Sequence, residues 1–333
     1  MMKNNTLKRL TGRTEFWIFL VLIVLCIIIQ CVSGSLLSPT TIVTILRDLI
    51  VDGMFCLVCL LIMVSGGFDL SFPAIAALAY SASTTICLNN GWCNENPLAG
   101  FLIAIAIGAG LGMLNGWIIS SFKLNTMIVT LGTQTLFLGI SMGLLQMKEI
   151  TSTLPQGFKN LGVSSLFTVT NERGLTSTMS TLFIAFVALA VVCSFILNKT
   201  MFGRALYAIG GNEVSAERAG YNVRKTKFIL YTVTGALSGF IGMVRVCLAS
   251  QSIPKALVGK EMTIIPAVIL GGASIFGGEG TVFGTVCAIS LITVFKDNMI
   301  SLGIDSYWQD FFNGLIILVG ITISAVQAKR RLK

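Results

Sequence analysis

Apolar runs of about 20 residues, separated by short polar segments, recur along almost the whole chain. An α-helix needs roughly 20 apolar residues to cross the hydrocarbon core of a bilayer. The pattern therefore predicts an all-α integral-membrane protein with about ten transmembrane helices and a single membrane domain over residues 1–333. The predicted spans are, in order, Phe16–Val32, Leu49–Ser65, Leu70–Leu88, Leu98–Ser121, Met127–Met147, Thr178–Leu197, Phe228–Leu248, Met262–Ile275, Thr281–Phe295 and Phe311–Val326.

Two of these runs, the eighth and the ninth, are shorter than a membrane crossing and are separated by Gly277, Gly278 and Gly280. We expect this part of the chain to be tilted, broken or re-entrant. The first run follows a basic segment and resembles a signal peptide. No strong small-residue cleavage site follows it, so it is interpreted as a retained first span.

Composition narrows the class of protein. Hydrophobic residues make up 54% of the chain and charged residues only 11%, whereas a soluble domain is about 25% charged. This argues against a soluble enzyme, a nucleic-acid-binding domain and a disordered protein. The chain has no His, which excludes His-based triads, His metal sites and His pH switches. We expect no metal and no cofactor on this chain.

Most of the nine Cys lie inside apolar runs, where Cys behaves as a small hydrophobic residue. Cys56 and Cys59 form a CxxC pair, but no other ligand lies nearby, so packing is the favoured interpretation. Cys87 and Cys93 differ because they flank a polar loop. They can form a disulfide if that loop faces an oxidising compartment.

The basic residues orient the spans. With ten spans and a cytoplasmic N-terminus, the C-terminus is cytoplasmic too. The cytoplasmic side then carries 15 of the 23 Lys and Arg residues, as the positive-inside rule requires. Six of the 15 lie in the segment 198–227, the largest cytoplasmic connection. Residues 148–177 form a long outer loop rich in Ser, Thr and Gly.

The segment 198–227 contains a predicted short helix. Gly210 and Gly211 are expected to break the backbone after Ile209, and Asn212 is a good N-cap. Residues 213–219 then form the helix, and Gly220 is a natural stop. From the residues alone, a helix that docks into a partner and one that rests on lipid headgroups are equally favoured.

Two glycine-rich breaks interrupt apolar runs. The first is Ser65-Gly66-Gly67-Phe68-Asp69-Leu70-Ser71-Phe72-Pro73, and the second extends from Gly271 to Gly280. Irregular backbone within a membrane is tolerated only where it is buried in protein or lines a cavity. The first break therefore either lines the substrate path or is a cytoplasmic turn in which Asp69 caps the next helix. Their similarity hints at an internal repeat.

Further polar and glycine positions have simple interpretations. Gly108, Gly110, Gly112 and Gly116 on the fourth span indicate close helix packing, and Asn115 is the polar side chain there that could face a pathway. Arg245 lies near the outer end of the seventh span. It is expected to reach the interface, with an ion pair to Glu261 as the alternative.

The motifs, taken together, resemble the membrane permease of ribose-type bacterial ABC importers, which carry simple sugars and related molecules. The matching stretches run from about residue 45 to 295. They are SGGFDLSFPAIAALA, LGMLNGWIISSFKLNTMIVTLGT, KTMFGRALYAIGGNEVSAERAGYNVRKTK and GKEMTIIPAVILGGASIFGGEGTVFGT.

The resemblance implies an inner-membrane subunit that works with a second permease subunit, identical or paralogous. It also implies separate ATPase subunits, which would bind ATP and Mg²⁺, and a periplasmic binding protein that delivers the substrate. No phosphate-binding loop occurs in this chain, which agrees with a separate ATPase. The segment 198–227 would hold the helix that couples to the ATPase. Its candidate residues are Gly211, Asn212, Glu213, Ala216, Glu217, Arg218 and Gly220.

The chain departs from the family pattern near the expected path. Phe72 and Pro73 stand where the family has a small residue and Gly, Thr126 stands where Pro is common, and Leu138 replaces a frequent Arg. These changes bear on the substrate and on the gate. They also suit a subunit that works beside a more typical partner.

The favoured function is therefore a non-enzymatic permease subunit for a sugar or sugar-like molecule, surrounded by lipid and without a nucleic-acid partner. The alternatives are an ion-coupled secondary transporter, a membrane-embedded lipid hydrolase, and a related permease for nucleosides or branched-chain amino acids. Candidate pathway and gate residues are Gly66, Gly67, Phe68, Asp69, Phe72, Asn115, Thr130, Thr133, Gln134, Gly271, Gly272 and Ser274.

Overall fold

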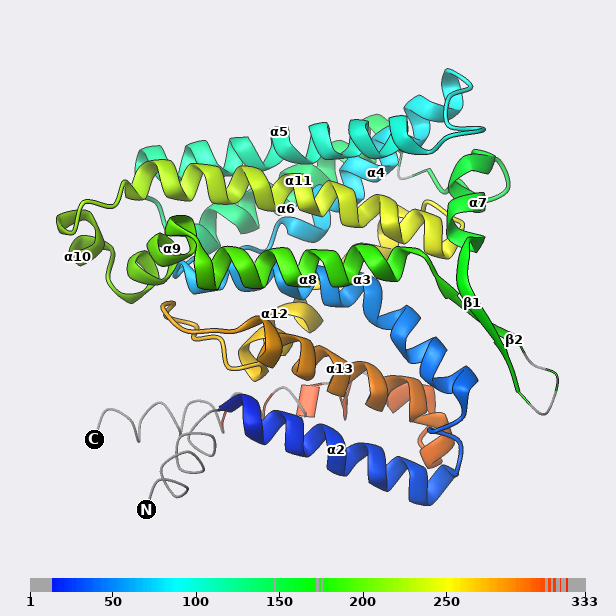
Figure 1. Ribbon diagram of the computed structural model, residues 1–333. Helices are drawn as coiled ribbons and strands as arrows, with labels where there is room; N and C mark the ends of the chain where they lie inside the picture. Colours follow the sequence, from blue (N-terminus) through cyan, green and yellow to red (C-terminus); the bar gives the residue numbers. More distant parts are fainter. Residues whose placement is uncertain are drawn as a thin grey trace, which may run out of the picture.

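The computed structural model describes residues 14–146, 148–171, 174, 176–308, 311, 312, 314, 315, 318 and 322. The described part is built almost entirely of α-helices (Figure 1), which confirms the predicted all-α class. The expected last span, 311–326, lies mostly outside the described residues.

The helices follow the predicted order. Those before the long loop are α2 (Thr14–Ser33), α3 (Pro39–Val64), α4 (Phe72–Asn89), α5 (Leu98–Phe122) and α6 (Thr126–Leu145). The loop holds α7 (Gln156–Val163) and two strands, β1 (Ser165–Thr170) and β2 (Thr176–Ser180). After it come α8 (Leu182–Lys199), α9 (Met201–Gly211), α10 (Glu213–Arg218), α11 (Val223–Ala249), α12 (Glu261–Leu270), α13 (Val282–Asn298) and the short 3-10 turns Pro254–Leu257, Ile300–Leu302 and Ser306–Trp308.

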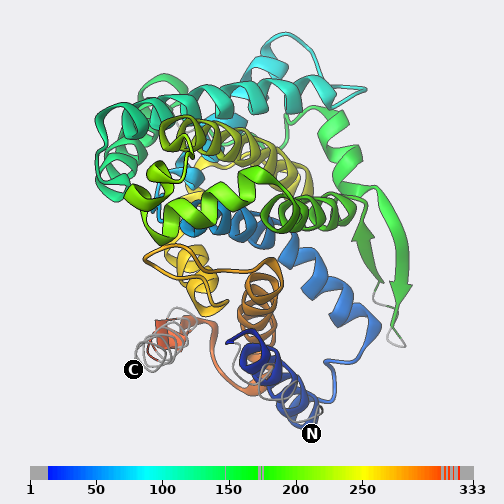
Figure 2. The same cartoon turned by 60° about the vertical axis from the view of Figure 1, so that its left-hand side comes forward.

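Helix α3 forms the centre of the core. Every residue from Gly53 to Val64 is buried, as expected for a stretch that is apolar on all sides. The helix contacts α8, α11, α12 and α13, and its Phe55 packs on Phe72 of α4. Figure 2 shows that α2 and α13 lie together on one side of α3, while α5 and α6 lie on the other.

Glycines bring α5 and α11 together. A Cβ on Gly108 would collide with the backbone of Gly235, and a Cβ on Gly112 would lie 2.9 Å from the Cα of Gly235. Gly116 meets the backbone of Phe228 in the same way. The prediction of close packing is thus confirmed for Gly108, Gly112 and Gly116, whereas Gly110 faces open space.

Large apolar side chains are exposed along the outside of the bundle. Among the described residues, five helices are long and apolar enough to cross a membrane: α2, α5, α6, α8 and α11. Apolar side chains on their surfaces, such as Ile128 at 72% and Leu144 at 79% exposure, lie where lipid would cover them. The protein is therefore a multi-pass membrane protein.

The predicted eighth span is a broken helix. Helix α12 has ten residues and is about 15 Å long at 1.5 Å per residue, which is half of a bilayer core. It ends at Gly271, and the chain turns through Gly272 at φ +93° before α13 begins. Gly271 packs against the first turn of α13, where a Cβ would lie 2.7 Å from the Cα of Thr285.

The loop 148–177 is more structured than the sequence indicated. Strands β1 and β2 form an antiparallel hairpin in which Thr168 pairs with Thr178, so the predicted span from Thr178 begins too early. Its helix, α8, starts at Leu182. Thr and Val in this segment favour extended backbone, which accounts for the two strands.

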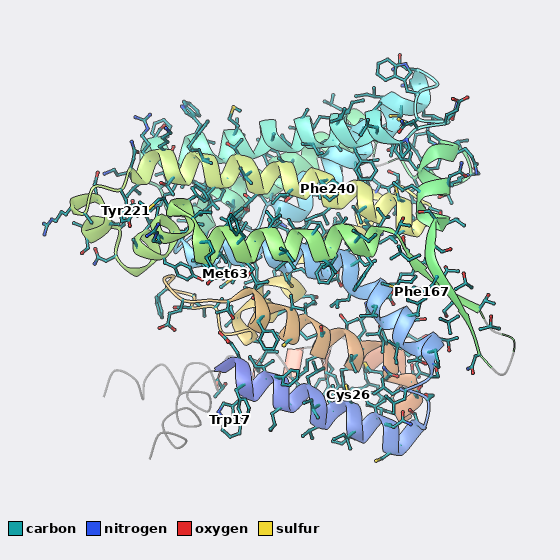
Figure 3. All side chains as sticks on the ribbon, in the orientation of Figure 1. Trp17, Cys26, Met63, Phe167, Tyr221 and Phe240 are labelled. Carbon is teal, nitrogen blue, oxygen red and sulfur yellow. The ribbon has the colours of Figure 1, made fainter. Side chains whose placement is uncertain are left out.

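The bundle has two distinct ends (Figure 1). At one end, called the α10 end, α3 finishes and the segment α9–α10 lies. At the other, called the hairpin end, are α7 and the two strands. Figure 3 places Tyr221 at the first and Phe167 at the second. Near the hairpin end, the Sγ atoms of Cys87 and Cys93 are 2.7 Å apart, as two thiols, so the disulfide stays a prediction.

Candidate coupling segment and membrane pathway

Helix α10 forms as its residues predict. The side chain of Asn212 accepts a hydrogen bond from the N–H of Ser215 at 2.8 Å, which is the N-cap geometry expected. The carboxylate of Glu213 pairs with Lys227 at 2.6 Å. Gly220 follows the helix at φ +90°, a conformation that favours glycine. Both the cap and the stop are thereby confirmed.

One face of α10 is anchored and the other is open. Ala216 is buried with Ile209 and Val223 in a small apolar cluster. Val214, Glu217 and Arg218 are exposed on the opposite side. The exposed face of α10 therefore presents one apolar side chain, Val214, beside one negative and one positive side chain. The buried Ala216 cluster holds the helix in place.

The predicted break at Gly210 and Gly211 is wrong, because both residues complete the last turn of α9. The glycine at 210 serves close packing instead. A Cβ there would collide with the carbonyl of Val64 and would lie 2.5 Å from the N–H nitrogen of Gly278. The end of α9 therefore presses directly on the backbone of two other segments.

The two glycine breaks meet at this point. The N–H of Gly278 donates to the carbonyl of Val64 at 2.9 Å, and a Cβ on Gly277 would lie 2.5 Å from the Cα of Gly66. Gly67 packs against Ile62 and the hydroxyl of Tyr231. The breaks, distant in sequence, form one backbone junction with the end of α9.

A tyrosine adds a polar link to the junction. The hydroxyl of Tyr207 on α9 donates to the carbonyl of Gly280 at 2.7 Å. Burial and the nearby negative charge of Glu15 raise the pKa of Tyr207, so the hydroxyl keeps the proton that it donates. The hydroxyl of Ser274 accepts a hydrogen bond from the N–H of Phe276 at 3.1 Å. The side chain of Ser274 therefore stabilises the turn in which it lies.

Hydroxyl groups of α6 satisfy the irregular backbone of the first break. The N–H of Phe68 donates to the Thr126 hydroxyl at 2.9 Å. The N–H of Leu70 donates to the Thr130 hydroxyl, which donates in turn to the carbonyl of Phe68. Thr126 is one of the departures from the family pattern, and a proline there could not accept this bond.

Asp69 is buried in protein, not in lipid. Its Oδ1 accepts from the N–H and the hydroxyl of Ser71 at 2.6 and 2.7 Å. Asn115 donates to the same hydroxyl at 2.8 Å, so a polar chain links the start of α4 to α5. Ser71, not Asp69, occupies the N-cap position. Asn115 is fully buried and faces Ser71. The ring of Phe72 is also buried, and it packs on the ring of Phe55.

A second set of polar groups lies further along α6, at Thr133 and Gln134. The Thr133 hydroxyl donates within its own helix to Thr130. Gln134 donates to the Oε1 atom of Glu261 at 2.7 Å. The alternative of an Arg245–Glu261 ion pair is therefore wrong. Within the described residues, the Nη1 atom of Arg245 and the Oε2 atom of Glu261 are buried without a hydrogen-bond partner.

A polar cavity lies beside this set, and its residues are not among the candidates predicted from the sequence. Lys260 pairs with Asp52 of α3, with its Nζ atom 2.8 and 2.9 Å from the two carboxylate oxygens. The pair borders a cavity of about 360 Å³ between α3, α12 and α13. Hydrophobic periodicity does not show that a half-helix starts at residue 261, so it could not bring Lys260 next to Asp52.

A multi-pass helical bundle with a half-helix, satisfied backbone breaks and buried polar groups is the architecture of a membrane permease. Residues 41–321 match the family described as "Branched-chain amino acid transport system / permease component". The chain belongs to this family.

Curated relatives match over almost their full length. The chain is 33% identical to the ribose import permease protein RbsC of Bacillus subtilis, with 92% of this chain and 91% of that protein covered. It is 28% identical to RbsC of Escherichia coli K12, with 96% and 98% covered. It is 30% identical to the galactose/methyl galactoside import permease protein MglC of the same strain, with 97% of each covered. No solved structure matches the chain.

These findings confirm the resemblance to sugar import permeases that the sequence motifs indicated. The relatives are transporter subunits, which fits a chain that is not an enzyme.

Proposed function

We propose that this chain is the membrane-spanning permease subunit of an ATP-driven importer for a simple sugar or sugar-like molecule. It would form the path together with a second permease subunit, identical or paralogous. A separate ATPase would hold ATP and Mg²⁺ at the α10 end, and a periplasmic binding protein would deliver the substrate at the hairpin end. The chain would lie in the bacterial inner membrane with both termini in the cytoplasm.

The observation that carries the proposal is the connection from α10 to the glycine junction. The open face of α10 offers a docking surface, and only Asn212 separates α10 from the end of α9, where Gly210 contacts Val64 and Gly278. Movement of α10 by an ATPase would therefore shift both backbone breaks together. ATP binding would favour one arrangement of the spans and loaded binding protein the other.

The relatives support the substrate class, since they are named ribose and galactose import permeases. Internal charges argue against the ion-coupled alternative. Asp52 is paired with Lys260, and Asp69 accepts hydrogen bonds from Ser71. Both carboxylates therefore have partners within the protein. Nucleoside transport remains the second candidate, because the furanose of a nucleoside carries the same hydroxyl groups.

The test is a substitution on the open face of α10. In Val214→Glu, an added charge replaces the exposed apolar side chain, while the Asn212 cap and the Glu213–Lys227 pair remain. We expect loss of co-purification with the ATPase and a loss of ATP-dependent uptake of sugar in proteoliposomes. The matched control is Val163→Glu, which makes the same substitution at an exposed residue of α7 at the hairpin end. This variant should keep the ATPase bound.

Uptake that needs an ion gradient and no ATP would contradict the proposal and favour a secondary transporter. A substrate panel of pentoses, hexoses and nucleosides, measured on the unsubstituted complex, decides between the two candidate substrates.

A further inference from the structure

Helix lengths place the cavity beside the Asp52–Lys260 pair near the middle of a bilayer core whose edge is set at the end of α3. Asp52 precedes the end of α3 at Val64 by twelve residues, which is about 18 Å of helix. Lys260 lies just before the first residue of α12. The length of α12 sets Lys260 about 15 Å from the glycine junction at the α10 end. Both estimates set the ion pair halfway across a core of about 30 Å. A half-helix beside a polar site at this depth is typical of transporter binding sites.

The cavity is large enough for a small molecule. Its volume of about 360 Å³ lies in the range of about 300–1,000 Å³ common for ligand sites. A neighbouring cavity of about 320 Å³ shares the Asp52–Lys260 pair and extends to Arg47 and Arg245. Arg47 lies about five helical turns before Val64, nearer to the hairpin end. The second cavity thus extends from the Asp52–Lys260 pair toward that end.

The lining indicates which chemistry fits. The Asp52 carboxylate and the Lys260 ammonium neutralise each other, yet 17% and 29% of their side-chain surfaces remain exposed. Thr263 and Thr293 add hydroxyl groups, and Ile292 adds an apolar wall. Lys296 also lines the cavity, and its charge is offset by the nearby carboxylates of Asp48 and Asp297. Such a lining gives hydrogen-bond donors and acceptors to neutral hydroxyl groups and an apolar surface to the C–H face of a sugar ring.

We propose that this cavity holds a neutral, monosaccharide-sized polyol during transport, with the Asp52–Lys260 pair as its hydrogen-bonding wall. The inference rests on the proposed function and assigns the substrate site within it. An unpaired charged ligand is disfavoured, because binding to either partner would break an ion pair that is partly removed from water.

The first experiment fills the cavity. Thr263→Trp would place an indole in it, and the matched control Thr135→Trp makes the same change on the exposed surface of α6. We expect ribose or galactose uptake near background for Thr263→Trp, while the ATPase stays bound and its stimulation by loaded binding protein persists. Uptake at the control rate would overturn the proposal.

A second measurement does not depend on turnover. In Thr263→Cys, the rate of thiol modification at position 263 is measured by peptide mass spectrometry, with Thr135→Cys as the control. Millimolar ribose or galactose should slow modification at 263 alone. Protection by ribose 5-phosphate or by anionic lipid, with none by neutral sugar, would overturn the assignment. If the unsubstituted complex takes up no sugar with ATP, the proposed function itself fails. If the unsubstituted complex and the Thr135 controls take up sugar, the experiments test only the assignment of the cavity.

Discussion

At the scale of single residues, glycine decides how closely the backbones of this protein approach. Gly112 meets α11 so tightly that a Cβ would collide with the carbonyl of Tyr231, whereas Gly110, two residues earlier on the same helix, has nothing within 4 Å. The sequence shows the glycines but not which side of the helix faces a partner. Their contribution to stability therefore differs although their local sequence is alike.

We predict that Gly112→Ala destabilises the protein by about 1–3 kcal/mol, the typical cost of overpacking. Gly110→Ala should be neutral or slightly stabilising, because Ala is the better helix former by up to about 1 kcal/mol. Thermal unfolding of the two variants in detergent is the measurement. Equal melting temperatures would show that α5 and α11 do not pack through Gly112.

At the scale of elements, the short helices and breaks matter more than the long spans. Helix α12 crosses only half of the bundle, and its loop returns to touch the ends of α3 and α9. The backbone of this junction has its hydrogen bonds satisfied by carbonyls and by hydroxyls such as that of Thr126. The irregular backbone is therefore tolerated within the bundle.

Gly210→Ala should weaken the link between α10 and the breaks. The added Cβ would force α9 away from Val64 and Gly278. We expect sugar uptake to fall by roughly tenfold with less change in ATP hydrolysis, so that fewer molecules enter per ATP. The control is Gly143→Ala on α6, where a Cβ meets open space. A constant ratio of uptake to hydrolysis in Gly210→Ala would contradict the coupling role of this contact.

At the scale of the whole molecule, the two ends are built differently. The α10 end carries the exposed helix and the basic segment 198–227, while the hairpin end carries α7 and the β-hairpin. The distribution of Lys and Arg predicts that the α10 end faces the cytoplasm.

Topology is testable in intact cells with a membrane-impermeant thiol reagent. Thr168→Cys on the hairpin should react from outside, and Ser215→Cys on α10 should react only after the membrane is opened. The unsubstituted chain, with its native cysteines, gives the background. The reverse pattern would invert the proposed orientation and would place α10 away from any cytoplasmic ATPase.

The sequence by itself determined the class of fold, most of the spans and the short helix α10. These depend on local properties, namely apolar length, the Asn212 cap and the Gly220 stop, which act within a few residues. It also indicated the two glycine breaks and the kinship with sugar permeases.

Only the tertiary structure decided what the breaks contact and where the polar groups face. The meeting of Gly66, Gly210 and Gly277, and the pairing of Asp52 with Lys260, join residues far apart in the chain. Hydrophobic periodicity records which residues avoid water, but lipid and protein interior are both apolar. The pattern therefore could not separate a side chain facing lipid from one facing another helix, nor reveal the cavity between α3, α12 and α13.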